Sequence, residues 1–100
     1  MSKFSFSLKD LQQALKDSRH LSIQGLCGKI PLGTYQDSDG DEYRVCVSYN
    51  GTDDMGSPYF KFGVLDGRIA SFISTDFKYY IAHPNEVLIA FIRLFNEGGL

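Results

Sequence analysis

The 100-residue chain has few of the features that mark a specialised class of protein. It contains no tryptophan, three prolines and two cysteines. Two cysteines cannot build a disulfide framework, and neither Cys27 nor Cys46 belongs to a closely spaced pair of the kind found in structural zinc sites. The longest apolar run, residues 87–92, is far shorter than the roughly 20 residues of a transmembrane helix. We therefore expect no disulfide scaffold, no metal or other cofactor, and no membrane segment.

Charge of a single sign is also scarce, because the formal net charge is only −2. That balance argues against the uniformly basic surface of most nucleic-acid-binding proteins, so we do not expect nucleic acid as the main partner. An apolar fraction of 43 % with 22 % charged residues is typical of one folded domain, here residues 1–100. No continuous apolar stretch follows Met1, as a signal peptide would require, and this favours a cytoplasmic location.

What the sequence does contain is a strong pattern of helix signals near its start. Ser7 and Asp10 have the spacing of a helix capping box, with Asp in place of the usual Glu. Leu8, Leu11 and Leu15 then fall on one helical face. The pattern predicts a helix over residues 8–19 that packs by one apolar stripe.

From residue 21 to residue 82 the apolar residues alternate instead, which predicts strands. Eight phenylalanines and six tyrosines favour such a sheet-rich core. The expected strand regions are residues 21–35, 42–49, 59–64, 68–74 and 77–82, with tight turns at 66–67 and 75–76. Pro31 cannot donate a ladder hydrogen bond, so the first region should lie at an edge or be bulged.

A second helix is expected over residues 84–96. Pro84 suits the first helical position, and Gly98 and Gly99 supply the stop. The predicted fold class is therefore α+β: an N-terminal helix, an antiparallel meander of about five strands and a C-terminal helix, with both helices on one face of the sheet. The second helix is apolar over so wide an arc that part of it should meet another subunit, which predicts a homodimer or an obligate partner.

Acidic residues are concentrated in one part of the chain. Between residues 37 and 54 six carboxylates accompany a single arginine, and they are Asp37, Asp39, Asp41, Glu42, Asp53 and Asp54. In a meander these residues form two loops at opposite ends of one strand. They act either as solvated turns or as a surface that docks on a basic partner. The start at Asp37 is similar to an EF-hand calcium loop, but Glu42 and Ser48 occupy positions that need Gly and Glu, so a hairpin loop is favoured.

Tyrosines are the second candidate for recognition. Tyr43 and Tyr49 share one face of an expected strand, and Tyr59, Tyr79 and Tyr80 lie on neighbouring strands. Two helices cover only one face of the sheet, so some of these rings should be exposed on the other face, where aromatic side chains often bind partners. The alternative is that they flank the core and expose only their hydroxyl groups.

No constellation for catalysis stands out, so we expect a small binding protein of the inhibitor, immunity-protein or adaptor type, with a basic macromolecular partner. Two alternatives remain open. One is a nucleic-acid or nucleotide binder that uses the tyrosines and the basic N-terminal segment, which carries Lys3, Lys9, Lys16 and Arg19. The other is a small enzyme with a Cys27–His83 pair.

Overall fold

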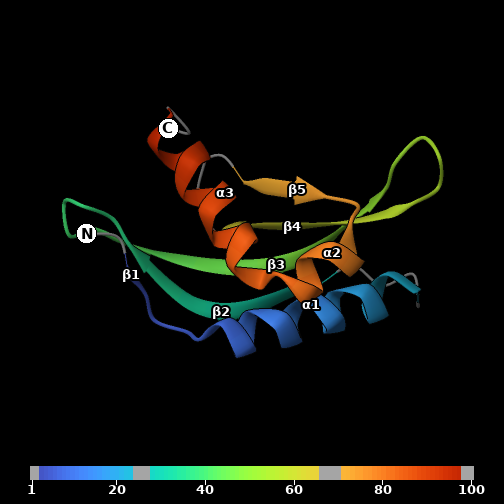
Figure 1. The fold of residues 1–100 in the computed structure, drawn as a ribbon, viewed down its shortest axis with the longest axis horizontal. Helices are drawn as coiled ribbons and strands as arrows, with labels where there is room; N and C mark the ends of the chain where they lie inside the picture. Colours follow the sequence, from blue (N-terminus) through green and yellow to red (C-terminus); the bar gives the residue numbers. More distant parts are fainter. Residues whose placement is uncertain (1–2, 24–27, 66–70, 98–100) are drawn as a thin grey trace.

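A computed structural model describes residues 3–23, 28–65 and 71–97 and shows an α+β fold (Figure 1). The elements, in chain order, are β1 (Lys3–Phe4), α1 (Leu8–Ile23), β2 (Lys29–Gln36), β3 (Glu42–Thr52), β4 (Pro58–Val64), β5 (Phe72–Ser74), α2 (Phe77–Ala82) and α3 (Pro84–Asn96). The five strands form one antiparallel sheet in the order β1-β2-β3-β4-β5. The predicted fold class is confirmed.

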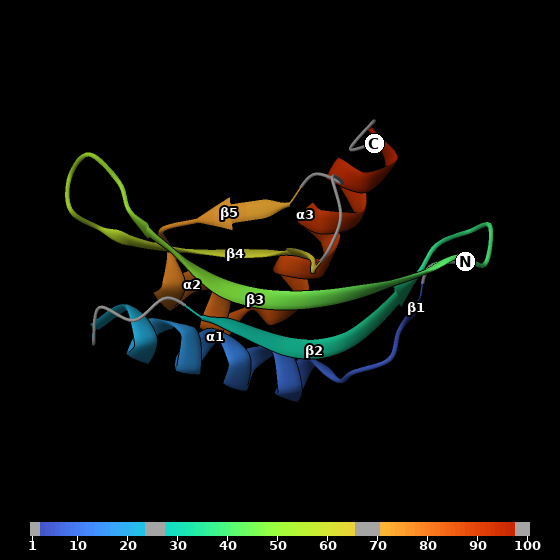
Figure 2. The same ribbon diagram turned by 180° about the vertical axis from the view of Figure 1, so that it is seen from behind.

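All three helices lie on the same side of the sheet. Figure 1 views the molecule from the helix side, and Figure 2 views it from the side on which the strands lie in front. We call these sides the covered face and the bare face. Among the described helices, none combines the length and the apolar character needed to cross a lipid bilayer.

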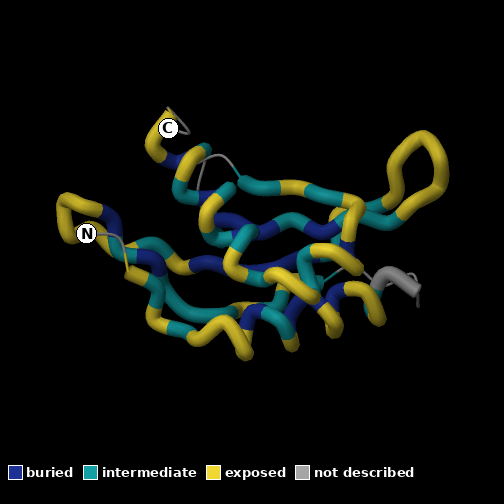
Figure 3. Tube along the Cα trace, viewed as in Figure 1, coloured by how far each residue is buried: buried dark blue, intermediate teal, exposed yellow. Residues whose placement is uncertain are grey.

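The core fills the space between the covered face and the helices. Tyr35, Val47 and Phe62 point from the sheet into this space, where Leu11 of α1 and Phe91 of α3 meet them. The Phe91 ring stands edge-on to Phe62 and to Tyr35, with centroids 5.2 Å apart in each pair, a favourable geometry for aromatic pairs. Buried residues occur on β2, β3, β4 and all three helices, whereas β1 and β5 carry none (Figure 3).

The N-terminal helix begins where the sequence predicts. The backbone N–H of Asp10 donates to the Ser7 hydroxyl, and the N–H of Ser7 donates to the Asp10 carboxylate, both at 3.1 Å, so the capping box is confirmed. The helix continues to Ile23 and not to residue 19, and its buried stripe is formed by Leu11, Leu15 and Ser18. The prediction of strand structure for residues 21–23 is wrong, and residues 24–27 lie outside the described part.

The first sheet region differs in one further respect, because Phe4 pairs with Tyr35 and adds strand β1. Strand β2 carries the predicted irregularity, a register shift between Pro31 and Gly33. Gly33 is needed there, because a side chain at this position would run into the Ser5 hydroxyl, to which the N–H of Thr34 donates at 2.7 Å.

The predicted last strand, residues 77–82, is a helix. Asp76 caps it by accepting from the N–H of Tyr79 at 3.1 Å. Phe77 and Tyr80 then share one helical side and both pack on Phe60. Aromatic and β-branched residues favour strands in isolation. Here a helix is formed instead, because only a helix places Phe77 and Tyr80 on the same side, where both rings pack on the core. The turn expected at residues 75–76 is present, whereas the hairpin expected at 66–67 lies outside the described residues.

Helix α3 has its predicted bounds, with Pro84 at the start. Its most deeply buried residues are Val87, Phe91 and Phe95. Ile89 faces solvent, so part of the wide apolar arc stays uncovered within the described chain. The homodimer or obligate partner expected from this arc stays a prediction. The glycines proposed as the helix stop lie outside the described residues.

Candidate functional site

The acidic loop between β2 and β3 is a closed turn. The Asp37 carboxylate accepts hydrogen bonds from the N–H groups of Asp39 at 3.0 Å and Asp41 at 2.9 Å. The Tyr43 hydroxyl donates to its second oxygen at 3.4 Å. Asp37 is only 8 % exposed, so its charge serves the turn, while Asp39, Asp41 and Glu42 remain exposed around it. The expected hairpin loop is confirmed, and the structure shows no group of metal-ligating side chains among the residues it describes.

Tyr43 is tied to this loop and not to an exposed surface. Its ring packs edge-on against Phe95 with centroids 5.3 Å apart. Burial, followed by the negative charges of Asp37 and Asp41, raises the pKa of the Tyr43 hydroxyl above its usual value. Ionisation of the phenol is disfavoured because it would place a second negative charge beside the buried Asp37 carboxylate.

The loop between β3 and β4 repeats the same turn in a different setting. Asp53 accepts from the N–H groups of Met55 and Ser57, both at 2.9 Å. Gly56 takes a positive φ of 81°, which favours glycine. This hairpin projects from the body of the protein at the end opposite the first loop, as expected for two loops flanking one strand (Figure 1). Met55, at its tip, is 88 % exposed.

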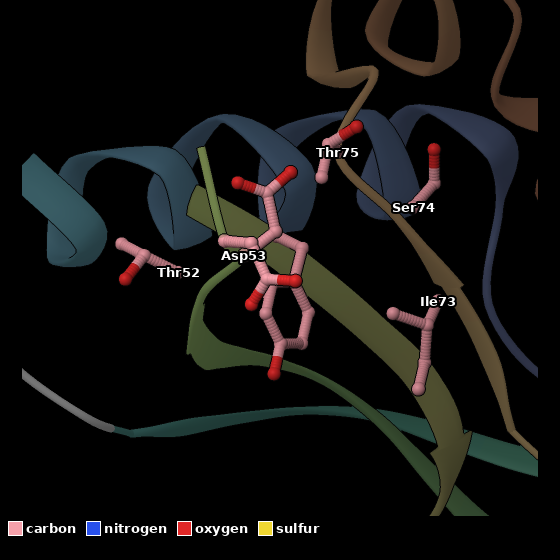
Figure 4. Close-up of a pocket in the computed structure, with 7 residues that line it drawn as sticks. Thr52, Asp53, Ile73, Ser74 and Thr75 are labelled. Carbon is pink, nitrogen blue, oxygen red and sulfur yellow. The ribbon is translucent and has the colours of Figure 1, made fainter. Parts of the chain in front are cut away.

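A hollow of about 640 Å³ lies between this hairpin and strand β5. Figure 4 shows Thr52 and Asp53 of the hairpin on one side, and Ile73, Ser74 and Thr75 on the other. Asp54 and Tyr59 complete the lining. We call this site the acidic hollow. It joins two carboxylates, a phenol ring, three hydroxyl groups and the half-exposed Ile73 side chain within one open depression.

Four residues of the acidic hollow were absent from the prediction, and they are Thr52, Ile73, Ser74 and Thr75. Tyr59 was one of the candidate tyrosines, and the alternation in β4 indicates the direction of its side chain. Phe60 and Phe62 point to the covered face, so Tyr59, which directly precedes Phe60, points to the bare face. Ile73 gives no such signal, since only the pairing of β5 with β4, which sets Ile73 opposite Lys61, brings it there.

The predicted tyrosines do not form one surface. Tyr43 and Tyr49 lie on the covered face of β3, because they are spaced two and four residues from Val45 and Val47, whose side chains face the helices. Tyr79 and Tyr80 lie on helix α2, so their expected place on a strand is wrong. Tyr80 packs on the core. Burial is the main cause that raises the pKa of its hydroxyl group, and the negative charges of Tyr79, Asp76 and Glu86 raise this pKa further.

The residues of the nucleophile hypothesis are only partly described. Cys46 is buried in the middle of β3, as expected of a small hydrophobic side chain. His83 is exposed and stacks on the Tyr79 ring, with centroids 4.6 Å apart. Cys27 lies outside the described residues, so a Cys27–His83 pair stays a prediction.

Comparison with known proteins adds no relative: no family model, no curated protein and no solved structure gives a significant match to this chain.

Proposed function

We propose that this chain is a non-catalytic binding protein, of the inhibitor, immunity-protein or adaptor type, that docks on a basic macromolecular partner through the β3–β4 hairpin. The observation that carries the proposal is the acidic hollow. It joins Asp53 and Asp54 to Tyr59 and Ile73, which the sequence alone leaves apart.

The chemistry of the acidic hollow suits a lysine or arginine side chain of a protein partner. Asp54 makes no hydrogen bond to any other described side chain or backbone group, so its carboxylate is available to an incoming cation. Tyr59 offers a ring face for a cation–π contact, and Ile73 offers apolar area for the methylene stem of the same side chain.

The hairpin tip extends this surface beyond the acidic hollow. Met55 is flexible and polarizable, and side chains of this kind adapt to partner surfaces of different shapes. Asp53 holds the tip rigid through its two backbone hydrogen bonds, and a preformed loop loses less conformational entropy on binding than a mobile one.

The other acidic loop provides a matched control, because it forms the same turn. We compare Asp53→Asn/Asp54→Asn with Asp39→Asn/Asp41→Asn, which change the net charge equally, and asparagine preserves the acceptor that closes the hairpin. Affinity capture from the native host identifies the partner, and stopped-flow mixing of the purified proteins then gives the association rate. We expect about a tenfold slower association at low salt for the hairpin pair and less than about a twofold change for the control.

Three results would contradict the proposal. In one, every protein that the wild-type chain captures is also captured by the hairpin variant. In another, both variants associate as fast as the wild type. In the third, the control is slowed and the hairpin pair is not, which would assign docking to the loop at residues 37–42.

The nucleic-acid alternative receives less support from the arrangement of the described residues. Tyr43 is not available as part of a stacking platform, since its ring packs on the core, and Tyr49 is half-buried on the same face of β3. Lys9, Lys16 and Arg19 of α1 are exposed, so this alternative would depend on phosphate contacts alone.

A further inference from the structure

Strands β2, β3 and β4 bring two lysines to either side of one serine on the bare face. Lys29 pairs directly with Ser48, and Ser48 pairs directly with Lys61. Because neighbouring strands lie about 4.8 Å apart, the two lysine backbones are about 10 Å from one another with the serine midway. All three residues line the same small hollow.

This second depression, which we call the lysine hollow, has a volume of about 50 Å³. Its remaining lining is Cys46, Gly63, Val64 and Leu65. One water molecule needs roughly 10–15 Å³ of such space, so the lysine hollow accommodates a group of about four oxygen atoms. A tetrahedral oxyanion has this size.

Lys29, Ser48 and Lys61 make no side-chain hydrogen bond or ion pair to another described residue. Ser48 is only 7 % exposed, and its hydroxyl makes no hydrogen bond to a described residue. Neither Lys29 nor Lys61 forms an ion pair with a described carboxylate. Two ammonium groups that border one hollow repel each other, and the Ser48 hydroxyl is left free to donate to a ligand.

An anion resolves all of these features at once. Its oxygens accept hydrogen bonds from the Ser48 hydroxyl and from both ammonium groups, and charge-assisted bonds of this type are the strong ones. The three residues stand on adjacent strands of one sheet, so the donors are positioned before the anion arrives.

A wider depression of about 400 Å³ adjoins the lysine hollow and shares Lys29 and Ser48 with it. Gly28, Tyr49 and Asn50 line the rest. An anion seated between the lysines could therefore carry a substituent. We propose that Lys29, Ser48 and Lys61 bind a phosphate group, either as inorganic phosphate or as the terminal phosphate of a small ester. The proposal is independent of partner docking, because it uses none of the acidic residues.

The test is isothermal titration calorimetry of the full chain in phosphate-free buffer, with sodium phosphate as one probe and adenosine monophosphate as the other. Adenosine controls for binding of the base without phosphate. Tighter binding of the nucleotide than of inorganic phosphate would indicate an ester whose substituent occupies the wider depression. Equal affinities would indicate that the phosphate group alone is recognised.

Variants then assign the binding to these residues. We expect Lys29→Gln and Lys61→Gln each to weaken phosphate binding about tenfold, and Ser48→Ala to weaken it about threefold. Lys16→Gln on α1 makes the same charge change away from the bare face and should alter affinity less than about twofold. Thermal unfolding of each variant verifies that the fold is intact, and Lys29→Gln is the safest of them because Lys29 is exposed.

Several results would overturn the proposal. The proposal is wrong if neither phosphate nor adenosine monophosphate binds at a concentration of about 10 mM. Equal weakening by Lys16→Gln and Lys61→Gln would show a general charge effect and not a site. Binding of a single-stranded RNA oligonucleotide, with no binding of either small probe, would assign the bare face to a polyanion.

Discussion

The two faces of strand β3 are equally buried in mid-strand, yet they are built from different residues. Val45 and Val47 face the helices, and Cys46 and Ser48 face the other way. The valines are enclosed by a large apolar core. The cysteine and the serine line a small hollow bordered by lysines. Burial therefore does not by itself identify the core of this protein, because buried residues on one face pack in the apolar core and those on the other line a polar hollow.

The difference teaches where sequence change should matter for folding. A covered-face residue removes apolar area from water and fills space between helices and sheet, so truncation leaves a cavity. Lys61 on the bare face is half-buried and borders the lysine hollow, and a long charged side chain of this kind can bury its methylene stem while its charged end reaches water.

Neighbouring residues of β4 give the sharpest contrast. Phe62 is fully buried, and its ring contacts those of Phe4, Phe6 and Phe91. We expect Phe62→Ala to lower the free energy of unfolding by about 3–5 kcal/mol. Lys61→Ala should change it by less than about 0.5 kcal/mol. Urea unfolding measures both, and similar losses for the two variants would contradict the division of labour between the faces.

The bare face is nevertheless closely packed at one position. A side chain on Gly63 would meet the Ser71 hydroxyl and side-chain carbon. We expect Gly63→Ala to cost about 1–3 kcal/mol through this overlap. Ser71→Gly in the same chain should recover a large part of the loss, which a double-mutant cycle in urea detects. Additive effects of the two substitutions would show that the overlap is not the cause.

Alkaline pH should reveal the covered face through Tyr43. Because its pKa is raised in the folded state, the folded chain keeps a proton that the unfolded chain loses near pH 10. Stability is thus complete below that pH and falls as the pH rises through and above it. Unfolding midpoints between pH 8 and about pH 11 should show a shallower decline for Tyr43→Phe than for the wild type. An equally steep decline in Tyr43→Phe would contradict this assignment.

Local signals in the sequence predict much of the secondary structure. The Ser7–Asp10 capping box and Pro84 mark helix starts correctly, because each acts within one helical turn. The loop at residue 37 closes through hydrogen bonds over at most four residues, so its hairpin character also follows from the sequence. The segment at residues 77–82 is different, since its residue types favour a strand while its contacts with Phe60 require a helix.

The candidate sites depend far more on tertiary structure. The sequence by itself determined the acidic loops, the alternating strands and the two long helices, since these follow from charge, periodicity and capping over a few residues. Only the tertiary structure decided that Ile73 joins Asp53 and Tyr59 in the acidic hollow, and that Lys29 and Lys61 stand on either side of Ser48. Those neighbours belong to different strands, and shifting one strand by a single residue would turn its side chains to the other face. Register is fixed by burying the covered face, so the packing of one side positions the functional groups of the other.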